Sequence, residues 1–238
     1  MSNKNILILT TNDNFYVKRL LLKLKKNKKY NFYFSFIYEY DNLSNIITKL
    51  CLLGLINSGT FLLKDLYFKL SKKNIENTIN ANAVITEKSN KYLISIIKQK
   101  KISLILSINY PKKISEEIFN LPKYGAINLH LGKLPKYKGR SPVASAILNR
   151  EKKFTVTTHK INKYIDEGPI LFEKEFSIKK YDIIKIYEKF FNLSYNLLLK
   201  SISFSYKKKK YKRNYPSKTF KLSLMQKIKI YLILNWGL

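Results

Sequence analysis

Two side chains that can donate hydrogen bonds fall together at the end of a predicted strand. Asn128 and His130 close the apolar run at residues 125–129. Successive strand residues point to opposite faces, so an amide and an imidazole separated by one residue project from the same face. In open α/β sheets, ligands bind outside the carboxyl ends of the strands. The pair therefore predicts two polar groups aimed at one ligand.

A carboxylate follows 38 positions after the amide. Asp166 begins the sequence Asp-Glu-Gly-Pro, which has the composition of a turn between two strands and would present Asp166 at the tip of a loop. A carboxylate held beside a reacting group can act as a general base. Asp166 is therefore a candidate functional residue.

The segment at residues 131–142 lies between these groups and contains two prolines and two glycines. Such a segment follows a fixed course and lets its backbone approach a ligand closely. Its lysines, Lys133, Lys136 and Lys138, could attract an anionic ligand. They could equally be solvated surface charges.

Each candidate also has a purely structural interpretation. Asn128 could satisfy the end of its strand, and Asp166 could serve only the turn. His130 is one of two histidines in the chain, and its place beside Asn128 favours a functional role. The other, His159, lies in a predicted strand seven positions before Asp166. It could line the site, but a structural role is favoured.

The motif as a whole resembles the folate-dependent formyltransferases. That family includes glycinamide ribonucleotide formyltransferase, methionyl-tRNA formyltransferase and the sugar-nucleotide N-formyltransferases. The resemblance is close over residues 102–177 and looser before them. One departure is that Gly132-Lys133-Leu134-Pro135 stands where the family usually has a Ser-Leu-Leu-Pro-like loop. The matching positions are Asn128-x-His130, Leu134-Pro135, Tyr137, Gly139, Pro142 and Asp166-x-Gly168-Pro169-Ile170-Leu171.

The resemblance implies an N-formyltransferase that takes its formyl group from 10-formyltetrahydrofolate and needs no metal. Asn128 and His130 would donate hydrogen bonds to the oxygen that becomes negative when an amine attacks the formyl carbon. Asp166 would remove the proton from that amine and could hold His130 in a donor state. The resemblance also places the pterin ring against the backbone of two segments. The cofactor-binding residues it implies are Tyr110, Pro111, Lys112, Lys113, Ile114, Asn162 and Ile165.

The acceptor is inferred mainly from what is missing. The segment at residues 10–14 lacks the glycine-rich turn that cradles a phosphate at a helix start, which weakens a glycinamide ribonucleotide acceptor. The transfer-RNA enzymes of the family carry an additional β-barrel, and the 35 or so residues after position 203 are too few to build one. We therefore expect a small amine as the acceptor, namely a nucleotide-linked amino sugar of polysaccharide synthesis. Glycinamide ribonucleotide, or a non-catalytic basic binding protein on this scaffold, remains an alternative.

The elements that must position these groups alternate between strand and helix, which predicts an α/β fold with an open, mostly parallel, Rossmann-like sheet. Strands are expected at residues 6–9, 32–37, 81–85, 102–108, 125–129, 154–161 and 169–178. Helices are expected at residues 15–24, 43–70, 90–98 and 182–203, with Asp182 as the N-cap of the last.

The amino-acid composition limits which partners and which cellular location are expected for this protein. The net charge is +31, but only four of the 46 basic residues are arginine, the residue best suited to grip phosphates, so nucleic acid is not expected as the main partner. Cys51 is the single cysteine and excludes an intramolecular disulfide. The polar residues 1–5 lead straight into a strand, and no apolar stretch reaches the ~20 residues that span a bilayer. No signal peptide is therefore expected, and we predict a cytoplasmic protein.

The chain is predicted to divide into a catalytic domain at residues 1–205 and a basic arm with an amphipathic helix at residues 206–238. From residue 201 onward the sequence has ten basic residues and no acidic one. Apolar residues at helical spacing in 220–236 could pack on the domain or on a second copy in a homodimer, which is the favoured interpretation. A basic helix of this kind could instead lie on an anionic membrane.

Overall fold

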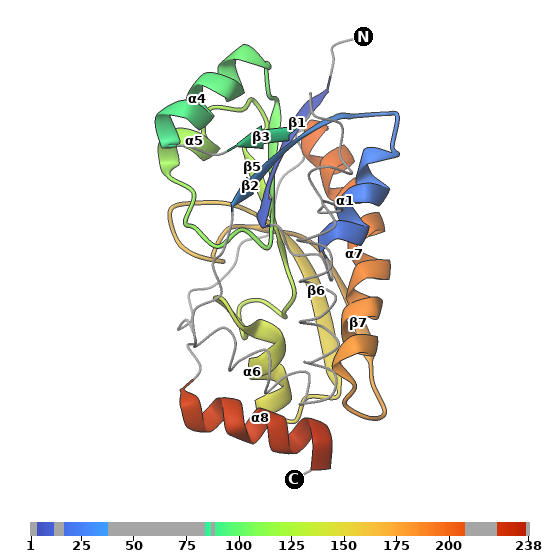
Figure 1. Ribbon diagram of the computed structural model, residues 1–238. Coiled ribbons are helices and arrows are strands. Elements are labelled where there is room, and N and C mark those ends of the chain that lie inside the picture. The colour runs from blue at the N-terminus through green and yellow to red at the C-terminus, as the bar shows by residue number, and fades with distance from the viewer. Residues whose placement is uncertain (1–3, 12–16, 38–83, 87–88, 208–222, 237–238) are drawn as a thin grey trace, which may run out of the picture.

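The computed structural model describes residues 4–11, 17–37, 84–86, 89–207 and 223–236. The helical region predicted at residues 43–70 lies outside them, as does most of the basic arm. In the described residues, the strands form one open sheet and the helices cover it, which confirms the predicted fold class (Figure 1).

The sheet has seven strands, of which the first five in spatial order are parallel. The last two run antiparallel to their neighbours. All seven strands correspond to predicted ones. In spatial order they are β3 (Val84–Thr86), β2 (Asn31–Ile37), β1 (Asn5–Thr11), β4 (Leu104–Ile108), β5 (Ala126–His130), β6 (Lys153–Lys160) and β7 (Ile170–Ser177).

Alternating side chains of the central strands build two apolar clusters, one on each face. Ile6 and Ile8 of β1 belong to one cluster, while Leu7 and Leu9 belong to the other. The first cluster includes α1 (Val17–Lys25) and α7 (Ile183–Tyr206), and the second includes α4 (Asn90–Gln99) and α5 (Glu116–Phe119). Figure 1 shows these helix pairs on opposite sides of the sheet. Burial on both faces explains why these strands are uniformly apolar in sequence.

Helix boundaries follow the sequence signals where such signals exist. The Asp182 side chain accepts a hydrogen bond from the backbone N–H of Lys185 (3.1 Å), which confirms the predicted N-cap of α7. Two helices were not predicted, α5 and α6 (Pro142–Leu148). The first has only four residues, and the second is apolar on nearly every side because it is buried, so neither shows an amphipathic stripe.

The turn between β6 and β7 requires a glycine at position 168. The Lys160 N–H donates to the Pro169 carbonyl (2.9 Å), which brings the two strands together immediately beside Gly168. A Cβ atom at position 168 would lie 1.6 Å from the carbonyl oxygen of Lys160. Because backbone atoms on both sides fix this contact, the absence of a side chain sets the course of the loop that carries Asp166.

The C-terminal helix α8 (Leu224–Trp236) packs beside α6, at the far end of the fold in Figure 1. Ile230 and Ile233 are 1% and 2% exposed and belong to the first apolar cluster. This agrees with the favoured interpretation that the apolar face packs against protein. The domain division at residue 205 stays a prediction. No helix within the described residues is both long enough and apolar enough to cross a bilayer.

Replacing Gly168 with alanine is expected to destabilise the protein by about 1–3 kcal/mol, because the new methyl group must displace backbone atoms. Urea denaturation of the variant measures this cost. Lys163→Ala in the same turn is the control and should change the free energy of unfolding by less than about 0.5 kcal/mol. Equal stabilities for the two variants would contradict the steric argument.

Two isoleucines of α8 test whether this helix is docked. Ile233→Ala removes a buried side chain and should cost about 2–5 kcal/mol. Ile228→Ala is the matched control, because Ile228 is 42% exposed in the same helix and its loss should cost far less. Chemical denaturation of both variants gives the comparison. A small effect at both positions would show that α8 does not share the core.

Candidate active site

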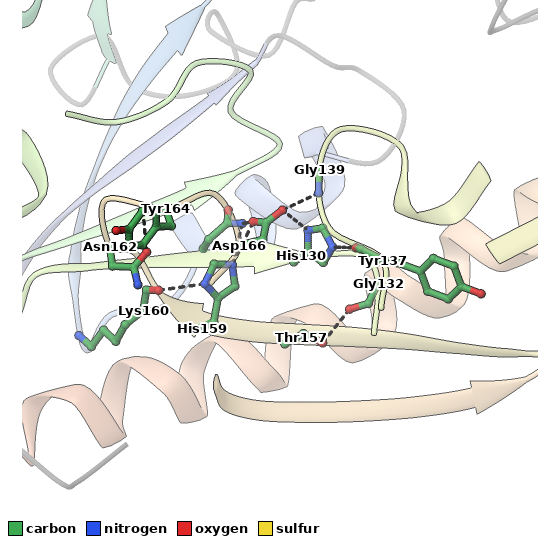
Figure 2. Close-up of polar contacts among 11 residues, drawn as sticks. His130, Gly132, Tyr137, Gly139, Thr157, His159, Lys160, Asn162, Tyr164 and Asp166 are labelled. Atoms are coloured by element: carbon green, nitrogen blue, oxygen red, sulfur yellow. Dashed lines mark hydrogen bonds and ion pairs between the residues drawn. The ribbon is translucent and has the colours of Figure 1, made fainter. Parts of the chain in front are cut away.

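Strand β5 presents Asn128 and His130 to one side of the sheet, as alternation requires. The neighbouring antiparallel strand β6 places His159 directly opposite Asn128. Asp166, from the loop after β6, reaches both β5 residues. The Asn128 side-chain N–H donates to Oδ1 of Asp166 (3.2 Å), and Nδ1 of His130 lies 3.6 Å from Oδ2. The three predicted residues therefore meet at the Asp166 carboxylate. Figure 2 shows His130 beside Asp166.

Asp166 is held inside the site. Its φ angle is +55°, a left-handed conformation that aspartate tolerates better than most residues. The loop was expected to expose Asp166 at its tip, but the side chain is only 8% exposed, whereas Tyr164 and Ile165 beside it are exposed. The backbone N–H of Gly139 donates to Oδ2 (2.8 Å) and fixes the orientation of the carboxylate. Asp166 therefore has a backbone conformation typical of a turn and, at the same time, a carboxylate that faces into the site.

The surroundings favour the charged form of this carboxyl group. Burial by itself raises the pKa of Asp166. Interactions with His159, the positive charge that His130 carries when protonated, and the Gly139 N–H outweigh it and hold the pKa well below its usual range. Asp166 is therefore a carboxylate at neutral pH and can accept a proton.

His130 is buried and makes its main hydrogen bond with the loop. Its Nε2 lies within hydrogen-bonding distance of the Tyr137 carbonyl, which can only accept, so Nε2 carries a proton. Burial lowers the pKa of His130, and the nearby Asp166 charge and Tyr137 carbonyl oppose this only in part. The neutral ring therefore turns its bare Nδ1 toward Asp166. The expected donor Nε2–H is engaged with the protein's own backbone.

His159 lies in the site, although a structural role was favoured for it. The side chain is 2% exposed, and its Nε2 is 3.1 Å from Nδ2 of Asn128 and 3.3 Å from Oδ1 of Asp166. Figure 2 shows the rings of His130 and His159 on either side of Asp166. The sequence signal that could have found it is strand pairing. If β6 pairs antiparallel with β5, a residue opposite Asn128 must face the same side.

A buried ion pair joins the proline- and glycine-containing loop to the turn that carries Asp166. Nζ of Lys138 donates to Oε1 of Glu167 (2.5 Å), and the Lys138 side chain is completely buried. The interpretation of Lys138 as a solvated charge or a free phosphate-attracting group is therefore wrong. Lys136 is half exposed and pairs with Glu151. Lys133 is exposed at the surface.

The two segments implied to bind the cofactor lie at one face of the sheet. Tyr110 and Ile114, from the loop after β4, share the second apolar cluster with Ile161, which begins the loop after β6. In that second loop, Oδ1 of Asn162 accepts from the backbone N–H of Tyr164 (2.9 Å) and shapes the turn. Lys112 and Lys113 are exposed in the first loop, and Pro111 is partly buried there. Ile165 is 50% exposed beside Asp166.

No group of three or more histidine, cysteine, aspartate or glutamate side chains in the described part of the chain could hold a metal ion. A cavity of about 200 Å³ is lined by the loop at residues 131–137 together with parts of β6 and β7. It includes none of Asn128, His130 or Asp166, and its Glu151 is already paired with Lys136 and Tyr137. The chemistry is therefore assigned to the carboxylate site and not to this cavity.

Comparison with known proteins gives three relevant matches. A methionyl-tRNA formyltransferase of Dictyoglomus thermophilum is 39% identical over 97 residues, which are 41% of this chain and 30% of the relative. The Mycobacterium tuberculosis protein Rv3404c, a suspected sugar N-formyltransferase, superposes with a TM-score of 0.58 at 17% identity, covering 92% of this chain and 74% of the other. HypX of Aquifex aeolicus, solved with tetrahydrofolic acid, gives a TM-score of 0.62 at 14% identity, covering 96% and 33%.

These matches differ in what they establish. The two solved structures share the fold at low identity and support the fold alone. In eight curated relatives, the matched segment spans only 18% to 38% of the relative's own length. The family model for formyl transferases matches residues 55–202, which is more than half of the chain. The motif around Asn128, the sheet that carries it and this match lead to one conclusion: the chain belongs to the formyl transferase family.

Proposed function

We propose that this protein is an N-formyltransferase that moves a formyl group from 10-formyltetrahydrofolate to a primary amine. The observation that carries the proposal is the environment of Asp166. This buried carboxylate is bound by the Asn128 amide and the Gly139 N–H and lies beside two imidazoles. A base so placed, next to groups that can donate hydrogen bonds, suits attack by an amine on an acyl carbon.

Each residue has a distinct task in the proposed reaction. Asp166 takes a proton from the attacking amine, since the surroundings keep it charged. Asn128 offers a side-chain N–H to the oxygen that gains negative charge, and one such donor is typically worth about 10²–10³ in rate. His130 donates its Nε2–H to the Tyr137 carbonyl. This bond holds the loop at residues 131–142 against β5, the strand that carries Asn128 and His130. The loop in turn delivers the Gly139 N–H to Asp166.

The folate co-substrate supplies the formyl carbon, and the two implied binding loops fit a pterin. Exposed Tyr164 and Ile165 border Asp166, while Tyr110 and Ile114 lie in the apolar cluster under the other loop. The Asn162 side chain is used within its own loop, which leaves backbone groups to meet the edge of the ring. This agrees with recognition that constrains side-chain identity only weakly. Tyr110, Pro111, Lys112, Lys113, Ile114, Asn162 and Ile165 are proposed to form the binding surface.

For the acceptor, we propose a nucleotide-linked amino sugar. Rv3404c, a suspected sugar N-formyltransferase, has the same fold, and the exposed Lys133 of the loop offers a positive charge that would attract a pyrophosphate. A second candidate is methionyl-tRNA, because a methionyl-tRNA formyltransferase is among the relatives and the chain carries a charge of +31. A panel of amino-sugar nucleotides, glycinamide ribonucleotide and methionyl-tRNA, each supplied with 10-formyltetrahydrofolate, separates these candidates. Formylation only of methionyl-tRNA would overturn the amino-sugar proposal.

Asp166→Asn should lower kcat by about 10²–10⁴, because the substituted amide cannot accept the amine proton. The measurement is formyl transfer to the acceptor found in the panel, with the melting temperature recorded in parallel. Asp182→Asn makes the same chemical change at the N-cap of α7, where asparagine also caps well, and should leave kcat unchanged. Full turnover by the Asp166 variant would refute the assigned base.

A further inference from the structure

The imidazole of His159 is fixed in one tautomer by its own backbone. Its Nδ1 lies 2.9 Å from the Lys160 carbonyl, which can only accept, so Nδ1 carries the proton of the neutral ring. The bare Nε2 then accepts from the Asn128 amide at 3.1 Å. In Figure 2, the ring points from β6 toward Asp166. Its other neighbour is Oδ1 of Asp166, at 3.3 Å.

This arrangement engages both side-chain protons of Asn128. One is donated to Oδ1 of Asp166 and the other to Nε2 of His159. An amide nitrogen has only two protons to donate. Asn128 therefore has no free N–H for a developing oxyanion while His159 is neutral.

We propose that His159 receives the amine proton from Asp166 and, by taking it, releases an N–H of Asn128 toward the reacting oxygen. This inference rests on the proposed formyl transfer. Once protonated, Nε2 of His159 is a donor to Asp166 and can no longer accept from Asn128. Removal of the proton and stabilisation of the oxyanion are then coupled through one ring.

The proposed sequence balances atoms and charges. The amine nitrogen bonds to the formyl carbon, and the carbonyl π pair moves to oxygen. The proton of the amine passes to Oδ1 of Asp166 and then to Nε2 of His159. When the oxygen pair re-forms the carbonyl, the bond from carbon to the folate nitrogen breaks, and its electron pair stays on that nitrogen. The proton held by His159 is then delivered to this nitrogen through Asp166, and both side chains regain their starting state.

The geometry assigns this role to His159 and not to His130. Nε2 of His130 is committed to the Tyr137 carbonyl, and its Nδ1 is 3.6 Å from Asp166. The titratable groups facing His159 are Asp166 from the loop and His130 from β5, whose ring centroid is 6.4 Å away. Lys160, next in the same strand, extends to the Tyr124 carbonyl. Asp166 is thus the proton donor nearest to Nε2 of His159 in the proposed relay.

Two substitutions separate proton transfer from packing. His159→Gln keeps an acceptor for Asn128 but cannot take up a proton. It should lower kcat by about 10²-fold, the lower end of the 10²–10⁴ that general acid–base catalysis typically contributes. The pH profile of kcat should change, with KM nearly constant. His159→Ala leaves a space, so added imidazole should restore turnover to this variant and not to the glutamine variant. Thr158→Val is the matched control, because Thr158 instead bonds Ser201 of α7. It should lower the melting temperature and leave the pH profile unchanged.

A measurement without substrate keeps this inference distinguishable from the proposed function. In ¹⁵N-labelled protein, one Asn128 side-chain proton should lose protection from exchange in His159→Ala, because this variant lacks the acceptor at Nε2. The His159→Gln variant keeps an acceptor and should not show this change. Wild-type kcat and pH profile in His159→Gln, or wild-type Asn128 protection in His159→Ala, would overturn the inference. Absence of formyl transfer by the wild-type protein, with an Asn128 signal that responds to His159→Ala, would instead refute the proposed function and the relay. Only the hydrogen bond between the two side chains would then stand.

Discussion

Burying a carboxylate costs free energy unless hydrogen bonds or positive charges replace its contacts with water. Asp166 is such a carboxylate, so the residues around it must supply these interactions. Its partners come from three separate parts of the chain: Asn128 and His130 from β5, His159 from β6, and Gly139 from the loop between them. Strand β5 and the Gly139 loop are distant from Asp166 in sequence, and only β6 directly precedes its turn. The site therefore exists only when the sheet edge, the loop and the turn are assembled together.

The antiparallel pair β6 and β7 makes that assembly possible. After five parallel strands, the chain reverses at β6, so that His159 faces Asn128 and the following turn leads back over the end of β5. Two contacts hold the turn in place. Gly168 fits against the Lys160 carbonyl, where no side chain has room, and Glu167 binds the buried Lys138 of the loop. Both contacts position Asp166 without touching the reacting groups.

The fold of this chain is supported by its structural neighbours, but its acceptor is not. Similar sheets occur at little sequence identity in Rv3404c and HypX. A shared fold does not decide the acceptor. The acceptor depends on surfaces around the site, and this chain already differs from the usual family pattern there, at Gly132 and Lys133.

Local sequence determined the strands, the long helices and the Asp182 cap, because periodicity and capping are properties of neighbouring residues. The grouping of Asn128, His130 and Asp166 came from the resemblance of the whole motif to a known family. The helices α5 and α6 escaped prediction because one is short and the other is apolar on nearly all sides. Only the tertiary structure decided that Asp166 turns inward, that Lys138 is buried and that His159 joins the site. Each of these depends on a partner from a distant segment, which supplies the hydrogen bond, the opposite charge or the facing strand that no local pattern contains.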